Sequence, residues 1–130
     1  MIIKTATFNL FQFCSPEFSF YTKKEKFKKE DWEEKKNWIK EQLQKMNCDI
    51  VGFQEVFSQE ELKELVLECG FKEFVVVDEA KLDEKNRVYK STTVALASKF
   101  PIKNIENISK SSDFTFAREP IKATISLKND

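Results

Sequence analysis

The sequence contains no histidine, only two glycines and no long apolar run. Without histidine, the chain has no imidazole base, no Ser-His or Cys-His nucleophile pair and no His-ligated zinc. Two glycines cannot build a glycine-rich phosphate loop. No apolar run reaches the ~18 residues that a membrane span needs. Hydrolytic chemistry would therefore have to use carboxylates and amides, or residues that this chain does not contain.

The charges of the chain cancel, because 22 Lys and Arg residues are matched by 22 Asp and Glu residues among 130. A net charge of zero excludes a polybasic protein that coats nucleic acid, an acidic disordered tail and a supercharged membrane binder. Hydrophobic residues make up 41% of the chain, which is enough to form a core. We therefore expect at most one domain, over residues 1–130.

Three cysteines, Cys14, Cys48 and Cys69, are widely spaced and form no C-x-x-C pair. This spacing argues against a structural zinc site or a thioredoxin-like motif. The N-terminus lacks a basic segment followed by an apolar one, so we do not expect a secretory signal peptide. An odd number of cysteines without such a signal predicts free thiols and a cytoplasmic location.

Five short segments have the composition of β-strands. They are residues 2–10, 49–56, 74–77, 93–97 and 120–127. Residues 49–56 (DIVGFQEV) are almost continuously apolar, as expected for a strand that is covered on both faces. In the last segment, alternate residues from Ile121 to Leu127 are expected to point inward.

Two segments between these strands predict amphipathic helices. Asp31 is expected to cap the first helix, and a capping box formed by Ser58 and Glu61 is expected to open the second. Gly70 is expected to end the second helix in the left-handed conformation. The expected inner faces consist of Trp32, Ile39, Leu43 and Met46 in the first helix, and Leu62, Leu65, Val66 and Cys69 in the second.

Two further stretches predict irregular structure. Residues 11–21 are rich in aromatics without a regular period, which predicts a long loop packed on its own rings, and residues 78–90 are charged and expected to be flexible. The resulting order is strand, helix, strand, helix and three strands. This order predicts the α/β class, with a mixed sheet and helices on its outer face.

Glu55 is the most informative candidate for chemistry. It stands with Gln54 at the carboxyl end of a predicted buried strand, where open α/β sheets place their ligands. A hard divalent cation would keep a poorly solvated carboxylate ionised. The alternative is that Glu55 is only the polar end of a strand.

Three more residues are candidates for binding a phosphate or a base. Asn9 ends the first predicted strand and could donate to a phosphate oxygen, or it is an ordinary turn residue. Arg118 precedes the last strand and could bind two phosphate oxygens, or it pairs with Glu119 on the surface. Tyr89 follows a polar turn and could stack on a sugar or a base. Most of the 13 Phe side chains are expected in the core instead.

Four segments, taken in order, resemble the endonuclease/exonuclease/phosphatase superfamily. They are residues 5–10 (TATFNL), 49–56 (DIVGFQEV), 95–102 (ALASKFPI) and 116–121 (FAREPI). The last of these is similar to a stretch of the pancreatic-type deoxyribonucleases. The resemblance covers nearly the whole chain, and the D-I-V-x-x-Q-E-V element is its most specific part.

The resemblance implies a four-layer α/β sandwich that hydrolyses phosphodiester or phosphomonoester bonds with Mg²⁺ or Mn²⁺. It makes Glu55 the metal-binding carboxylate, Asn9 an active-site amide and Arg118 a phosphate contact. Tyr89 corresponds loosely to a tyrosine with which the deoxyribonucleases contact the minor groove. The implied partner is a phosphodiester substrate, with nucleic acid as the expected one.

The sequence also departs from the family pattern. The family's later His, Asp-x-Asn and Ser-Asp-His elements do not occur in it. We therefore expect the N-terminal half of the sandwich, an incomplete domain that binds metal weakly and is inactive alone. Two alternatives stay open. One is a non-catalytic half-fold that pairs with another chain or oligomerises through its exposed sheet, and the other is a lipid or inositol-phosphate phosphatase of the same fold.

Overall fold

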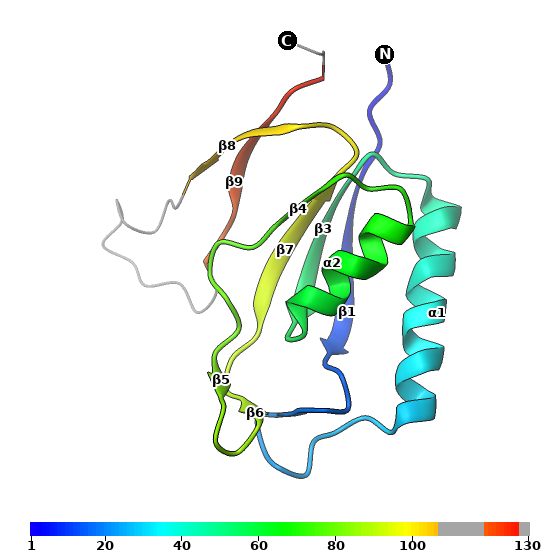
Figure 1. The fold of residues 1–130 in the computed structure, drawn as a ribbon. Helices are drawn as coiled ribbons and strands as arrows, with labels where there is room; N and C mark the ends of the chain where they lie inside the picture. The colour runs from blue at the N-terminus through cyan, green and yellow to red at the C-terminus, as the bar shows by residue number, and fades with distance from the viewer. Residues whose placement is uncertain (107–118, 128–130) are drawn as a thin grey trace.

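The computed structural model describes residues 1–106 and 119–127 of the chain. Within these ranges the chain forms helices and strands in a mixed α/β arrangement, which confirms the predicted class (Figure 1). In chain order the elements are β1 (Thr5–Phe13), β2 (Ser19–Phe20), α1 (Lys29–Met46), β3 (Ile50–Val56), α2 (Gln59–Glu68), β4 (Glu73–Val75), β5 (Leu82–Asp83), β6 (Val88–Tyr89), β7 (Thr93–Ser98), β8 (Ile102–Glu106) and β9 (Lys122–Ile125).

The main sheet has the strand order β1-β3-β7-β4. β1 and β3 are parallel, whereas β7 is antiparallel to both β3 and β4. A parallel pair needs a crossover connection, and α1 supplies it between β1 and β3. Figure 1 shows α1 and α2 on the same face of this sheet. The predicted mixed sheet with helices on one face is therefore present.

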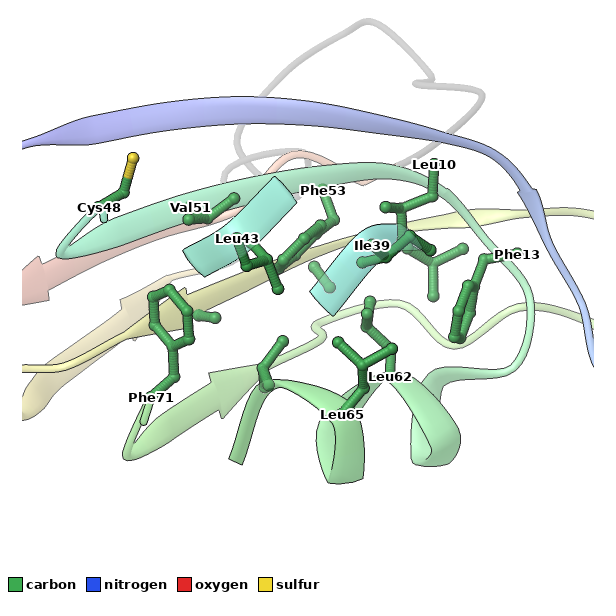
Figure 2. Packing of buried hydrophobic residues seen from close by; sticks show 14 of the residues in the cluster. Leu10, Phe13, Ile39, Leu43, Cys48, Val51, Phe53, Leu62, Leu65 and Phe71 are labelled. Atoms are coloured by element: carbon green, nitrogen blue, oxygen red, sulfur yellow. The ribbon is translucent and has the colours of Figure 1, made fainter. Parts of the chain in front are cut away.

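The main core lies between this face of the sheet and the two helices (Figure 2). Val51 and Phe53 of β3 point toward both helices and are fully buried. The predicted inner faces are confirmed for Trp32, Ile39 and Leu43 in α1, and for Leu62, Leu65 and Val66 in α2. Met46 and Cys69, at the ends of the two predicted faces, are only partly buried.

The opposite face of the main sheet is less covered. In β1, Thr5, Thr7 and Asn9 are exposed. In β3, the residues between the fully buried ones, Gly52 and Gln54, are partly exposed. The expectation that residues 49–56 are covered on both faces is therefore met on one face only.

Residues 11–21 are not one long loop, which corrects the prediction. β1 continues to Phe13, and β2 pairs in parallel with β6. β6 also pairs with β5, so part of the charged segment 78–90 is ordered as strands. A second cluster of buried side chains holds these short strands, and it consists of Cys14, Phe20 and Phe57. The Phe20 and Phe57 rings stack with their centroids 5.4 Å apart.

The helix starts differ from the predicted caps. α1 begins at Lys29, so Asp31 lies in its first turn, where a negative charge favours the helix dipole. Ser58 does precede α2, but its side chain makes no capping hydrogen bond. Its Oγ instead accepts the backbone N–H of Ser15 at 2.8 Å. Gly70 has a φ of 95°, which confirms the left-handed end of α2.

The last predicted strand does not join the main sheet. β9 pairs with β8, which the sequence did not predict, in a separate antiparallel sheet. Leu127 is 41% exposed, so the inward alternation expected from Ile121 onward does not extend to it. Neither helix in the described ranges has the length and apolarity needed to span a membrane.

Candidate functional site

Asn9 and Glu55 lie at the same edge of the main sheet. Because β1 and β3 are parallel, their carboxyl ends meet there, and Asn9 is directly opposite Gln54 in the register. Figure 1 shows the start of α1 at this edge as well. The parallel pairing therefore brings two candidate residues together that are 46 positions apart in the sequence.

Both strands are irregular at this edge. From Asn9 to Phe13, β1 advances four residues while β3 advances only two, from Gln54 to Val56. Phe11, Gln12 and Glu55 have φ angles of 51°, 63° and 60°. This left-handed conformation costs a non-glycine residue about 1–2 kcal/mol. Bulges of this kind redirect side chains, and they are frequent beside active sites.

Hydrogen bonds fix both side chains in the bulge. The backbone N–H of Gln12 donates to Glu55 Oε2 at 3.0 Å, across the two strands. The N–H of Phe11 donates to Asn9 Oδ1 at 2.9 Å. Asn9 thereby keeps its amide N–H groups as donors, which is what contact with a phosphate oxygen requires.

A divalent cation at this edge would have one carboxylate from the described residues. No group of three or more His, Cys, Asp or Glu side chains is arranged to hold a metal in residues 1–106 and 119–127. Mg²⁺ commonly binds through only one or two carboxylates, together with waters and substrate phosphates. Within the same ranges, the second oxygen of Glu55 accepts no hydrogen bond. The donors present fit this open mode of binding.

Lys35 of α1 also reaches this edge, which the sequence did not predict. Its Nζ donates to the carbonyl oxygen of Phe11 at 2.7 Å. Burial lowers the pKa of Lys35, and the negative charge of Glu55 opposes that shift. A signal was available in the sequence. Lys35 follows Trp32 by three positions and precedes Ile39 by four, which places it beside the buried stripe of the helix.

Tyr89 lies in a different environment. Its ring packs against Phe18 and Phe57, with centroids 5.3 Å and 5.6 Å away. Burial raises the pKa of Tyr89. It lines a cavity of about 550 Å³ whose acidic residues are Glu60, Glu61, Glu79 and Glu84. Four carboxylates oppose the approach of a polyanion, so this surrounding does not favour nucleic acid at Tyr89.

Arg118 lies outside the described residues, so its role as a phosphate contact stays a prediction. The cysteines offer no alternative nucleophile. Cys14, Cys48 and Cys69 are free, and the first two are buried. Burial raises the pKa of Cys14 to about 12, so at neutral pH it stays a protonated thiol.

Comparisons with protein-family models, curated proteins and solved structures found no match to this chain. The resemblance to the endonuclease/exonuclease/phosphatase superfamily therefore remains a prediction from the four sequence segments.

Proposed function

We propose that this chain carries the metal-binding carboxylate of a divalent-metal-dependent phosphodiester hydrolase, most simply a nuclease. The observation that supports this proposal is the shared sheet edge. Glu55 and Asn9 lie on two neighbouring parallel strands, beside a bulge in which the Gln12 and Phe11 backbone N–H groups hold their side chains. A carboxylate beside an amide donor is suited to a metal-bound phosphate.

Each side chain has a distinct role in this proposal. Glu55 holds Mg²⁺ or Mn²⁺, and its bond to the Gln12 N–H orients the carboxylate. The amide N–H groups of Asn9 donate to a phosphate oxygen, and Arg118 binds further phosphate oxygens. When bound, the metal polarises the phosphoryl group and stabilises the leaving oxygen.

The proposal also covers the fold around the site. In a four-layer sandwich, a second sheet packs on the face of the first sheet that the helices do not cover. That face carries Thr7, Gly52 and Gln54, which are exposed or partly exposed. Thr7 has a small side chain and Gly52 has none, which allows a second layer to approach closely. The main sheet would then be the inner layer beneath α1 and α2.

Hydrolysis also requires groups for acid–base catalysis, which Asn9, Glu55 and Arg118 do not supply. The family elements that supply a His for acid–base work are absent, and the sequence contains no His. We therefore propose that this chain alone binds the metal weakly and does not hydrolyse a substrate at a measurable rate.

Paramagnetic broadening of NMR signals by Mn²⁺ tests where the metal binds. Substoichiometric Mn²⁺ should broaden the backbone amide NMR signals of Asn9, Gln12 and Glu55 before others, because paramagnetic broadening falls steeply with distance. Preferential broadening at the acidic cavity, around Glu60 and Glu79, would place the metal elsewhere and contradict the proposal.

A non-catalytic half-fold is the second candidate, and the edges of the main sheet favour it. β1 and β4 are its outer strands in the described part of the chain, so each has a backbone edge open to pairing. Sedimentation velocity distinguishes the two proposals. A concentration-dependent rise in sedimentation coefficient would favour pairing, whereas a concentration-independent monomer would argue against it.

A further inference from the structure

We propose that Lys35 is a phosphate-contact residue at the edge formed by Asn9 and Glu55. This inference deepens the proposed function, on which it rests, by adding the cation that receives a phosphate oxygen there. The sequence segments that resemble the nuclease family do not include Lys35, so the argument comes from its position alone.

The ammonium group of Lys35 is held in place by the β1 bulge. Nζ donates to Phe11 O at 2.7 Å, and it lies over the Phe11 and Phe27 rings, 5.7 Å and 5.1 Å from their centroids. Asn9 Oδ1 binds the N–H of the same Phe11 residue. Lys35 and Asn9 are thus both hydrogen-bonded to Phe11, Lys35 at its carbonyl oxygen and Asn9 at its N–H.

Lys35 is also not neutralised by a partner. In residues 1–106 and 119–127, no carboxylate lies within ion-pair distance of Lys35 Nζ, although Glu55 is near enough to interact with it electrostatically. An ammonium has three N–H donors, and the Phe11 carbonyl takes one. A partly buried ammonium with unused donors is well suited to a phosphate oxygen, for which Lys acts as a point charge.

Lys35 lies beside Glu55, the carboxylate proposed to hold a metal. Substitution of Lys35 should therefore change the affinities for phosphate and for the metal in opposite directions. Lys35→Gln removes a positive charge that attracts phosphate and repels a divalent cation. Phosphate affinity should therefore fall and Mn²⁺ affinity should rise. If Lys35 only supported the bulge through Phe11, its loss would misplace Asn9 and Glu55 together, and both affinities would fall.

The first arm measures inorganic phosphate binding without metal, by ¹⁵N NMR titration of the full chain at pH 7. Lys35→Gln should weaken phosphate binding about tenfold, whereas Lys35→Arg should retain it. Glu55→Gln should strengthen phosphate binding, because it removes a like charge beside the ligand. Lys36→Gln, the same change at the next residue, serves as the control because Lys36 pairs with Glu33 at 3.2 Å.

The second arm measures Mn²⁺ binding to the same variants by calorimetry. Lys35→Gln should bind Mn²⁺ about threefold more tightly, and the gain should shrink in high salt. Loss of both affinities in Lys35→Gln, or no change in phosphate binding, would overturn the proposal for Lys35.

The two arms keep this inference separate from the proposed function. If Mn²⁺ does not bind the unaltered chain, the metal proposal fails, and the metal-free phosphate arm still decides the role of Lys35. Lys35→Arg guards against a folding artefact, because it preserves the charge and the hydrogen bond to Phe11 O.

Discussion

At the scale of single residues, burial decides the chemistry of Cys14. Its side chain is fully buried with Phe20 and Phe57, and burial raises its pKa from 9.0 to about 12. Above pH 9 the thiol of the unfolded chain loses its proton while that of the folded chain keeps it. The unfolded state then binds fewer protons, so the free energy of unfolding falls as the pH rises.

We therefore expect stability to decrease between about pH 9 and 12, by at most about 1.4 kcal/mol per pH unit from this thiol. Cys14→Ala should remove that contribution and flatten the slope. Urea unfolding at several pH values measures it. Burial also raises the pKa of Tyr89, which stays in the variant and leaves a residual slope. An unchanged slope in Cys14→Ala would contradict the account.

The left-handed residues of the bulge give a second residue-scale prediction. Gln12 has a φ of 63°, and its backbone N–H donates to Glu55 Oε2. Gln12→Gly relieves the conformational cost and keeps that N–H, so it should stabilise the fold by about 0.5 kcal/mol.

Gln42→Gly, in the interior of α1, is the matched control. It should destabilise the fold by about 1 kcal/mol, because glycine is unfavourable in a helix. Both variants are compared by urea unfolding. Equal losses of stability would show that the bulge is not strained at Gln12.

Asn9, Glu55 and Lys35 differ in how far their positions could be predicted from the sequence. The position of Glu55 near the end of β3 was visible from local patterns, because a strand is a local feature, whereas Asn9, predicted near the end of the first strand, is followed by four more residues of β1. Their proximity depends on the parallel pairing of β1 with β3, which the sequence only suggests. Lys35 was missed because a cation in a charged segment resembles ordinary surface.

At the scale of elements, the two glycines differ in whether their backbone conformation requires glycine. Gly70 ends α2 with a φ of 95°, whereas Gly52 lies within β3 and an added Cβ there would meet nothing within 4 Å. Gly70→Ala should destabilise the fold by about 1 kcal/mol or more. Gly52→Ala should be neutral or stabilise the fold slightly, because alanine lowers the backbone entropy of the unfolded chain.

Thermal unfolding of the two alanine variants tests this contrast directly. A lower melting temperature for Gly52→Ala than for Gly70→Ala would contradict the described geometry. Each variant is the control for the other, because both add one methyl group.

The elements that the sequence predicted correctly are those fixed by periodicity. The inner stripes of α1 and α2 follow from apolar residues spaced three and four apart. The caps at Asp31 and Ser58 were predicted from local preference, and neither forms, because α1 begins two residues before Asp31 and a tertiary contact occupies Ser58. Ser58 Oγ binds the Ser15 N–H instead of its own helix. The short strands β2, β5 and β6 were missed because two residues have no detectable period.

At the scale of the whole molecule, the main sheet is covered by helices on one face, and the metal is proposed to bind at the edge that carries Glu55. The sheet order β1-β3-β7-β4 places the Glu55 edge where open α/β sheets bind ligands, at the carboxyl ends of parallel strands. The acidic cavity at Tyr89 lies around the start of α2. The proposed phosphate site lies at Asn9, Lys35 and Glu55, and a role for Tyr89 stays a prediction.

Calorimetric titration with Mn²⁺ tests that claim most directly, using the unaltered chain, Glu55→Gln and Glu41→Gln. Glu41 is an exposed carboxylate of α1, so its variant controls for the loss of one surface charge. The account predicts binding heat for the unaltered chain and Glu41→Gln, and its loss in Glu55→Gln. Identical titrations for the unaltered chain and Glu55→Gln, with or without heat, would contradict a metal at Glu55.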